Sequence, residues 1–427
     1  MTFEQKLRKA PDYYRRDNCR LCQGTNLELL FSLVPTPPAE WYFRGEDRQA
    51  TSVSFPLDLF MCKSCSHVQL LDVLDPKSLF SDYFYESVTS PGLAQHFHEY
   101  ASEVSTKVGL ARGDLVVDIG SNDGLLLKEF RDLGYQVIGI EPSKNLAQKC
   151  NSTGIRTYNS FLHETVVEQV IVDSGQACLV TANNVFAHND DLREMARCTS
   201  QLLKDGGIFV FEVSSLLHTM KGLVFDYVYH EHLSYHSLLS LEPFLKEFSL
   251  QIYDAEVVET KGGSYRVYSK KALSPLPKSP RLMSAIREEI SSEIDTFAFY
   301  KKIYKRITNQ KNQLHMYFEQ LPEDAKVVGY GASATSTTLI YEFSLQEKLS
   351  YLVDDNPIRQ GCFLPGSNLE VFSPEYMFED SPTHVLLLAW RFKEMIINRI
   401  KNSLPKECVF IVPLPNLAII NGEELHH

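Results

Sequence analysis

The segment that most constrains the fold is VVDIGSNDG, in which an apolar run ends at Asp118 and a turn containing Gly120 and Gly124 leads into the helical run LLLKEFRDLG. A strand that passes through a glycine turn into a helix is the opening unit of a parallel α/β sheet. The chain keeps this alternation, with strands expected at QVIGIEPS, ACLVTANN and GIFVFEV and helical segments between them. The pattern predicts a Rossmann-like domain with helices on both faces of the sheet.

The residues of the same loop indicate which kind of cofactor it can bind. It departs from G-x-G-x-x-G, which places a pyrophosphate on a bare helix N-terminus. Asp118 and Asp123 repel a pyrophosphate but suit a cationic, phosphate-free cofactor such as S-adenosylmethionine (SAM), while a nicotinamide cofactor is the competing interpretation. Glu141 ends the next strand, where an acid binds ribose hydroxyls in nucleoside-binding sheets. We expect the cofactor to contact Asp118, Gly120, Ser121, Asn122, Asp123, Gly124, Glu141 and Pro142.

Two cysteine pairs lie near the N-terminus, Cys19-x-x-Cys22 and Cys62-x-x-Cys65. Each pair forms a knuckle that aims two sulfurs at one point, and two knuckles complete a tetrahedral zinc shell. Four protein ligands leave no open coordination position, so we predict a structural zinc ion that stabilises a small β-rich module. We expect His67 to be an ordinary histidine and not a fifth ligand.

The length and the charge of the chain limit the number of domains and the kinds of partner that it can have. The chain has 427 residues, which predicts two or three domains, and a formal net charge of −12. We expect no nucleic-acid partner, because no basic run accompanies this charge. We also expect no membrane span, since the apolar runs have only the length of strands. The N-terminus mixes acids and bases without an apolar core, which predicts a cytoplasmic protein, and we expect a monomer.

The second half of the chain predicts further elements. Residues 250–270 read as two strands around Gly262-Gly263, a hairpin suited to a sheet edge. Pro275, Pro277 and Pro280 indicate a linker before a long polar helix that ends near Gln320. A second alternation of strands and helices, from AKVVGYGAS to ECVFIVP, predicts another Rossmann-like domain. The expected divisions are a zinc-binding module, a SAM-binding domain, a linker with a helix and a C-terminal domain, at residues 1–85, 86–270, 271–320 and 321–427.

Several segments together resemble the bacterial deoxysugar C-methyltransferases, which add a methyl group to a carbon of a nucleotide-linked keto sugar. The resemblance covers nearly the whole chain. It is carried by CRLC…CKSC, DYFYES, VVDIGSNDG, IEPS, ANNVFAH, YHEHLSYHS, KGGSYRVY, VVGYGAS, LVDDNP and LLLAW. It implies an α/β protein with an N-terminal zinc-binding module, a central SAM-binding methyltransferase domain and a C-terminal Rossmann-like domain that helps to hold the nucleotide-sugar.

The resemblance also implies a reaction, in which a proton next to the sugar ketone is removed and the enolate attacks the sulfonium methyl group. It assigns the base to His232, with Tyr229 as the alternative. Glu231 and His188 orient groups or polarise the ketone, and Tyr83 reaches the same pocket. Asn184 lies over the cofactor after the fourth strand. We expect His230, His236, Met220, Phe225 and Tyr227 to be structural.

The C-terminal domain departs from the family pattern. GYGAS is followed by ATSTT, where a lysine, a glycine and an asparagine are usual, and Arg391 stands where an asparagine is common. The carrier nucleotide therefore stays open between thymidine and guanosine diphosphate, although Gly329 and Gly331 still offer a diphosphate cradle. Arg391 is either an anion donor or a solvated arginine. We expect methylation at carbon 3 of a 4-keto-6-deoxy sugar; a nicotinamide-dependent nucleotide-sugar oxidoreductase and a zinc-ribbon nucleic-acid methyltransferase are the alternatives.

Overall fold

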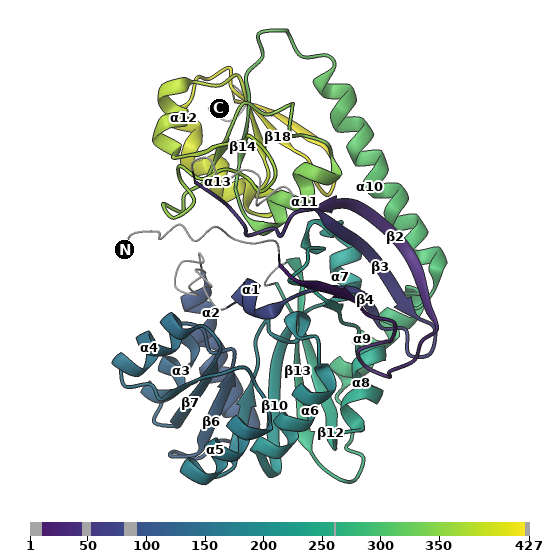
Figure 1. Cartoon of the computed structure of the whole chain (residues 1–427), viewed down its shortest axis with the longest axis vertical. Coiled ribbons are helices and arrows are strands. Elements are labelled where there is room, and N and C mark those ends of the chain that lie inside the picture. The colour runs from purple at the N-terminus through teal and green to yellow at the C-terminus, as the bar shows by residue number, and fades with distance from the viewer. Residues whose placement is uncertain (1–10, 45–52, 81–91, 260–261, 423–427) are drawn as a thin grey trace.

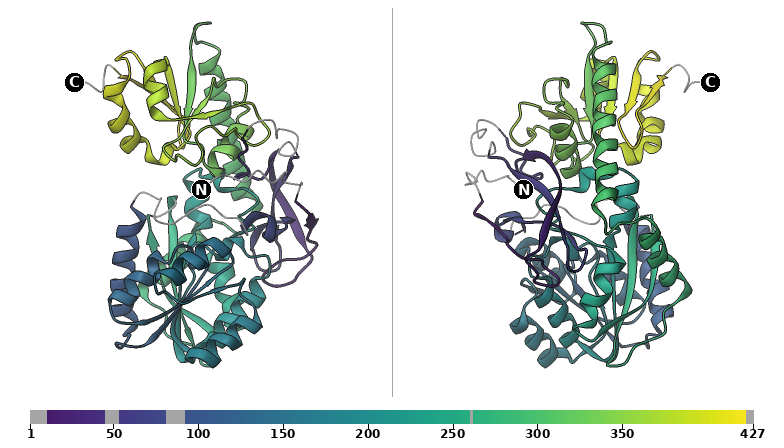
Figure 2. Two further views of the ribbon diagram at one scale, coloured as in Figure 1. Left: turned by 60° about the vertical axis from the view of Figure 1, so that its left-hand side comes forward. Right: turned by 90° about the vertical axis from the view of Figure 1, so that its right-hand side faces the viewer.

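The computed structural model describes residues 11–44, 53–80, 92–259 and 262–422. An α/β domain with a seven-stranded sheet lies at one end of the long axis, an α/β domain with a six-stranded sheet lies at the other, and the β-rich module lies beside the junction between them (Figures 1 and 2). The predicted fold class is therefore confirmed. Within the described ranges, no helix combines the length and the apolar character that crossing a membrane requires.

The N-terminal module contains a four-stranded antiparallel sheet in the order β11-β4-β3-β2 and a separate pair formed by β1 and β5. Alternate residues of β3 are buried, from Phe55 to Met61, as expected for a strand with one covered face. One edge strand of this sheet, β11, belongs to a later part of the chain than residues 1–85, where the zinc-binding module is predicted. The elements are β1 (Tyr13–Arg15), β2 (Leu27–Thr36), β3 (Phe55–Cys62), β4 (Val68–Leu70), β5 (Asp72–Leu74), α1 (Pro76–Phe80) and β11 (Ser234–Tyr235).

The larger domain is built on a sheet with the order β12-β13-β10-β9-β6-β7-β8. The five strands from β10 to β8 are parallel, and β13 is antiparallel to both of its neighbours, as the Gly262-Gly263 hairpin predicts. The strands are β6 (Leu115–Ile119), β7 (Gln136–Glu141), β8 (Thr157–Asn159), β9 (Ala177–Thr181), β10 (Leu203–Ser214), β12 (Leu250–Val258) and β13 (Ser264–Lys271).

Helices cover both faces of this sheet. Val116 and Val117 are neighbours on β6, yet Val116 packs into a core with α2 and α3, and Val117 packs into a core with α5, α6 and α8. The strand order reverses between β6 and β9, so the carboxyl ends of these strands form the edge where α/β sheets bind ligands. The helices are α2 (Leu93–Val108), α3 (Leu125–Asp132), α4 (Lys144–Ser152), α5 (Glu164–Ser174), α6 (Leu192–Leu202) and α8 (Leu238–Lys246), with the short helix η3 (Phe186–His188) after β9.

Besides α8, the described residues between β10 and β14 form four further helices. The predicted long helix is two helices, and α9 begins where the Ser279 side chain accepts a hydrogen bond from the N–H of Leu282 and Pro280 takes the first helical position. The 22-residue helix α10 runs along one side of the molecule towards the C-terminal domain (Figure 1). The elements are α7 (Leu216–Lys221), η4 (Phe225–Tyr227), α9 (Pro280–Ser291) and α10 (Phe297–Phe318).

The C-terminal domain has the sheet order β16-β15-β14-β17-β18-β19, parallel except for β19. Its core is continuous with that of the module, because Leu57 and Leu352 belong to one buried cluster. The elements are β14 (Val327–Tyr330), α11 (Ala334–Glu342), β15 (Leu352–Val353), β16 (Val371–Phe372), α12 (Pro374–Asp380), β17 (His384–Leu387), η6 (Trp390–Phe392), α13 (Lys393–Ile400), η7 (Lys401–Ser403), β18 (Val409–Val412) and β19 (Ala418–Asn421).

Candidate functional site

The four knuckle cysteines meet at one point, and their sulfur atoms all lie within 4.8 Å of one another. The Sγ atoms of Cys19 and Cys65 are 3.6 Å apart, and those of Cys22 and Cys62 are 3.5 Å apart. A tetrahedral zinc ion with Zn–S bonds of about 2.3 Å requires sulfur–sulfur distances of about 3.8 Å. A disulfide requires about 2 Å. The four thiols therefore fit a structural zinc ion, as the sequence predicts.

Both knuckles are closed by the same backbone turn. The N–H of Gln23 donates to the carbonyl of Cys19 at 3.0 Å, and the N–H of Ser66 donates to the carbonyl of Cys62 at 2.8 Å. Gln23 and Ser66 have φ of 61° and 60°, a left-handed conformation that folds each chain segment back after its second cysteine. His67 is fully buried and its Nε2 lies 3.2 Å from a β11 hydroxyl, so this side chain faces the sheet.

The predicted cofactor loop lies at the carboxyl end of β6. Gly120 and Gly124 have φ of 69° and 77°, which favours glycine at both positions. A Cβ atom on Gly120 would lie 2.6 Å from a methyl group of Val185, in the segment after β9. Close backbone approach at Gly120 therefore brings the loop into contact with the chain that leads to His188.

Glu141 ties the loop to the end of β7. Its buried carboxylate accepts the N–H of Asn122 at 2.9 Å and the N–H of Ser143 at 2.8 Å. Burial raises the pKa of Glu141 above its usual range, against the lowering effect of these two bonds. A carboxylate has about four lone-pair sites, so the oxygens retain capacity for ribose hydroxyls.

The remaining loop residues have distinct surroundings. Ser121 packs against the sheet, since a Cβ atom on Gly139 would lie 2.4 Å from the Ser121 hydroxyl oxygen. Asp123 accepts the N–H of Leu125 at 3.3 Å in the first turn of α3. The carbonyl of Pro142 accepts a bond of 2.8 Å from the side-chain amide of a β8 residue.

Asp118 supplies the second buried carboxyl group at this edge. It accepts a hydrogen bond of 2.6 Å from the hydroxyl of Thr181 on β9. Burial, together with the nearby carboxylate of Glu141 and against the lowering effect of the Thr181 bond, raises the pKa of Asp118 to about 7. Two buried carboxyl groups favour a cation and disfavour a pyrophosphate. The donor set therefore fits the cationic cofactor that the sequence predicts.

Asn184 follows β9 in a left-handed conformation, with φ of 58°. Its N–H donates to the carbonyl of Glu212 at 2.8 Å, which places the residue beyond the end of β9 beside β10. The carboxylate of Glu212 binds Arg266 at 2.8 Å and His96 at 2.9 Å. Sequence reasoning missed this buried network, because its members lie on α2, β10 and β13 with no shared motif.

The proposed base and its alternative are hydrogen-bonded to each other. The Tyr229 hydroxyl lies 3.0 Å from Nε2 of His232. Nδ1 of His232 lies 2.8 Å from the carbonyl oxygen of Tyr227, which can only accept, so Nδ1 carries the proton. In the neutral imidazole, Nε2 therefore carries the lone pair that a general base requires.

The second histidine lies beside the first, with His188 and His232 ring centroids 4.8 Å apart. Nδ1 of His188 donates to the carbonyl oxygen of Glu231 at 2.8 Å, so this bond joins η3 to the YHEH segment. The Glu231 side chain is buried. Tyr83 lies outside the described residues.

The residues expected to be structural are buried. His230 contacts the carbonyl of Phe55, and burial lowers the pKa values of His230 and His236 to about 4. Met220 and Phe225 belong to the core shared with the C-terminal domain. Tyr227 also belongs to that core, but its ring stacks on His232 at 5.6 Å and therefore borders the site.

Arg391 points inward from the C-terminal domain. Its guanidinium lies 4.5 Å from the centre of the Tyr227 ring and 3.3 Å from the carboxylate of Asp226, which is fully buried. Trp390 donates to the same carboxylate at 3.0 Å. Arg391 is thus a partly buried partner of Asp226 and not a solvated arginine. Asp226 escaped sequence reasoning, although an acid within the aromatic run FDYVYH was a usable signal.

The glycine loop of the C-terminal domain does not have the surroundings expected of a diphosphate cradle. The N–H of Gly331 donates to a β15 carbonyl at 2.7 Å, and the N–H of Ala332 donates to the carboxylate of Asp354 at 2.7 Å. At the start of α11, the N–H of Ala334 donates to the carboxylate of Glu40 at 3.2 Å. Two carboxylates accept the N–H groups that phosphate oxygens would need, so this arrangement does not support the predicted cradle at Gly329 and Gly331.

The divergent ATSTT segment is part of the same junction. The hydroxyl of Thr337 donates to the carbonyl of Ala39 at 3.1 Å, and the hydroxyl of Thr338 donates to the carbonyl of Val228 at 3.0 Å. The departures from the family pattern therefore coincide with contacts to the module and to the segment before Tyr229.

Three family models match successive parts of the chain. Residues 19–80 match a model described as "Putative zinc binding domain", residues 93–255 match "Methyltransferase domain" and residues 259–415 match "C-methyltransferase C-terminal domain".

Individual proteins match over different lengths. The C-methyltransferase NovU of Streptomyces niveus is 32% identical over 409 residues, which cover 95% of this chain and 97% of that protein. The ubiquinone biosynthesis O-methyltransferase of Escherichia coli O9:H4 (strain HS) is 28% identical over 30% of this chain and 54% of its own length. Magnesium protoporphyrin IX methyltransferase from Synechocystis PCC 6803, solved with bound SAM, aligns with a TM-score of 0.33 and 13% identity over 46% of this chain and 89% of that one.

Proposed function

Because the chain belongs to the family of bacterial SAM-dependent C-methyltransferases with an N-terminal zinc module, we propose that it methylates the carbon next to the ketone of a nucleotide-linked 4-keto-6-deoxy sugar, at carbon 3. The observation that carries this proposal is the His232–Tyr229 pair with His188 beside it. The carbon-bound hydrogen next to a ketone is acidic enough for such a base once the enolate oxygen is stabilised.

The protein's own groups perform the proton transfer. His232, protonated at Nδ1, takes the proton on Nε2, and the carbon–hydrogen bonding electrons move into an enolate. Tyr229 is the alternative base and passes its own proton to His232 along their 3.0 Å hydrogen bond. His188 donates through Nδ1 to Glu231, so it offers a second proton to the enolate oxygen only as an imidazolium.

We propose that the cofactor binds next to these groups. Asp118 and Glu141 receive the amino-acid and ribose ends of SAM, and Gly120 permits the close approach of its backbone. When bound, SAM supplies an electrophilic methyl group whose transfer leaves the bonding electrons on sulfur. Val185 contacts the Gly120 position and lies three residues before His188, which supports placing donor and base in one site.

The alternatives have weaker support. A nicotinamide at GYGAS would put a pyrophosphate beside Glu40 and Asp354. The phosphates of a nucleic-acid substrate would be repelled by a chain with a net charge of −12. The carrier is a thymidine or guanosine diphosphate, which screening keto sugars on each carrier distinguishes. We further propose a cytoplasmic monomer, which light scattering and cell fractionation test.

The decisive experiment is hydrogen exchange without methyl transfer. Enzyme and 4-keto sugar in deuterated water, without SAM, should exchange the hydrogen next to the ketone. His232→Ala should abolish both exchange and methylation, whereas Glu141→Ala should mainly weaken SAM binding. His98→Ala is the matched control, because His98 is an exposed histidine on α2. Full exchange in the His232 variant removes it as the base, and loss in Tyr229→Phe alone assigns that role to Tyr229.

A further inference from the structure

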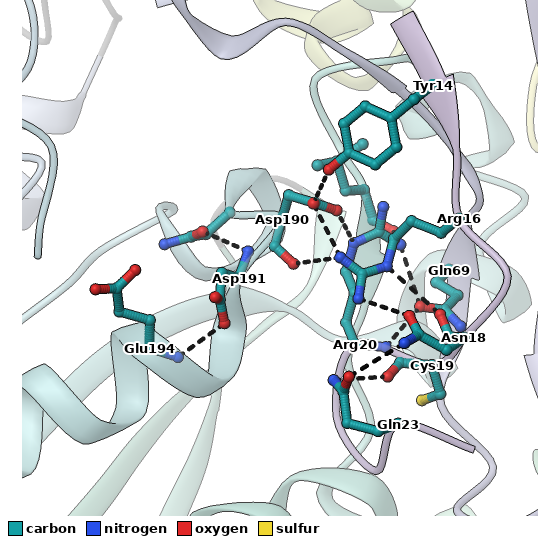
Figure 3. Close-up of polar contacts among 12 residues, drawn as sticks. Tyr14, Arg16, Asn18, Cys19, Arg20, Gln23, Gln69, Asp190, Asp191 and Glu194 are labelled. Carbon is teal, nitrogen blue, oxygen red and sulfur yellow. Dashed lines mark hydrogen bonds and ion pairs between the residues drawn. The ribbon is translucent and has the colours of Figure 1, made fainter. Parts of the chain in front are cut away.

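The zinc knuckle carries a buried arginine that reaches beyond the module. Arg20 lies between Cys19 and Cys22, and its side chain is 0% exposed. Its guanidinium points away from the cysteines and towards Asp190, and the side chain of Gln69 lies beside the guanidinium (Figure 3). A buried guanidinium donates in fixed directions, so its partners are held in a defined geometry.

Arg20 has partners in the module, where it donates to the carbonyl of Leu70 on β4 at 2.5 Å, and in two separate segments of the methyltransferase domain. Its Nε donates to the Asp190 carboxylate at 3.0 Å. One terminal nitrogen donates to the carbonyl of Leu233 at 3.3 Å and to the side chain of Gln69 at 3.1 Å. Arg16 also binds Asp190, at 2.9 Å, so this carboxylate receives two arginines from the module (Figure 3).

Each segment holds one of the two paired histidines. Asp190 follows His188 by two residues, and Leu233 comes directly after His232. The N–H of Leu233 donates to the carbonyl of Ala187 at 2.8 Å, which joins the two segments next to the histidine rings. Arg20 therefore binds the side chain of a residue close to His188 and the backbone carbonyl of the residue after His232.

We propose that Arg20 is a positioning residue that sets the distance and orientation of His188 and His232, and so couples the zinc knuckle to proton transfer. This inference rests on the proposed roles of the two histidines. When Arg20 is removed, the Arg16–Asp190 ion pair and the backbone bond from Leu70 to the carbonyl of Leu233 remain, so the module stays attached while the bonds from the guanidinium are lost. Small displacements of reacting groups lower turnover strongly, by up to about 100-fold for a misplacement of about 1 Å.

Zinc-loaded full-length protein carrying Arg20→Met or Arg20→Lys tests the proposal. We expect Arg20→Met to retain zinc and SAM affinity, to keep KM for the keto sugar within about twofold, and to lose about tenfold or more in kcat for exchange and methylation. Arg20→Lys should recover part of kcat, because one ammonium reaches either Asp190 or Leu233. Arg193→Met is the matched control, since Arg193 contacts the same knuckle through the Leu21 carbonyl at 2.7 Å.

The outcomes separate positioning from stabilisation. A merely structural role lowers the melting temperature and zinc retention but leaves kcat of the zinc-loaded fraction unchanged, and that result overturns the proposal. Equal kcat losses in the Arg193 and Arg20 variants also overturn it. If Arg20→Met fails to fold, Asp190→Asn takes its place. A kcat equal to that of the wild type in the zinc-loaded Asp190→Asn variant also overturns the proposal.

Histidine side-chain NMR shifts keep this inference distinct from the proposed function. In the zinc-loaded protein without substrate, Arg20→Met should shift the imidazole signals of His188 and His232, while Arg193→Met should not. Shifted signals with exchange that survives His232→Ala mean that positioning is real and the assigned base is wrong. Unshifted signals with unchanged kcat mean that Arg20 positions nothing.

Discussion

The affinity for SAM should rise with pH through the titration of Asp118, which is the buried carboxyl group at the end of β6. Burial raises the pKa of Asp118 to about 7, so in the free protein the group is largely protonated below that pH. Binding a cationic ligand favours the ionised carboxylate and therefore requires loss of the proton. Affinity should consequently fall as the pH decreases through about 7.

The magnitude follows from the fraction of ionised Asp118. For a pKa of about 7, the ionised fraction is about one eleventh at pH 6 and about three quarters at pH 7.5. If only the ionised form binds SAM, the dissociation constant should be about eightfold larger at the lower pH, equivalent to about 1.2 kcal/mol. Both pH values lie below the ordinary pKa of an α-amino group, so the ammonium of SAM stays mainly protonated.

Isothermal titration calorimetry with SAM in buffers of different ionisation enthalpy measures both the affinity and the protons released. Asp118→Asn should weaken binding at the higher pH and reduce the pH effect to less than about twofold. Asp132→Asn is the control, because Asp132 is an exposed acid at the end of α3 and belongs to no predicted site. A flat profile for the wild-type protein, or an unchanged slope in Asp118→Asn, refutes the assignment.

Three other perturbations test the remaining parts of the molecule. Cys62→Ser should lower both the bound zinc, measured by metal analysis, and the melting temperature, measured by calorimetry. Cys178→Ser is the control outside the cluster and should keep the metal, whereas a full zinc content in Cys62→Ser would contradict the site. Asp226→Asn leaves the partly buried Arg391 without its carboxylate. The free energy of unfolding in urea should therefore fall by about 2 kcal/mol, and no change would show that the pair is not needed. Glu40→Ala removes a carboxylate from the start of α11, so the variant should gain weak calorimetric binding of inorganic pyrophosphate; equal binding by wild type would show that Glu40 is no barrier.

The parts of the fold that depend on local patterns could be predicted from the sequence. The two CxxC pairs bring four sulfurs together, and the turn from Asp118 to Gly124 lies at the reversal of strand order. Both rest on short-range chemistry, namely the sulfur spacing of a knuckle and the backbone freedom of glycine. The His232–Tyr229 contact spans three residues, so it too was within reach.

The contacts between distant segments could not be predicted in the same way. Arg20 and Asp190 are 170 residues apart, and Glu40 and Ala334 are 294 residues apart. No periodicity links such pairs, since each contact exists only after separate sheets have packed. For this reason GYGAS reads as a diphosphate cradle in the sequence, whereas Glu40 from the module binds the helix start that a phosphate would use.

The origin of β11 has a consequence for synthesis on the ribosome. The zinc ligands are complete once Cys65 has emerged, but the strand that covers the edge of β4 ends at Tyr235. At about 5–20 residues per second, this interval lasts about 10 to 30 seconds. During that time the edge of β4 is open to pairing with other chains, since an unpaired strand edge is a template for association. Early zinc loading can therefore shape the knuckles, but the sheet of the module is completed only after Ser234 and Tyr235 have been synthesised.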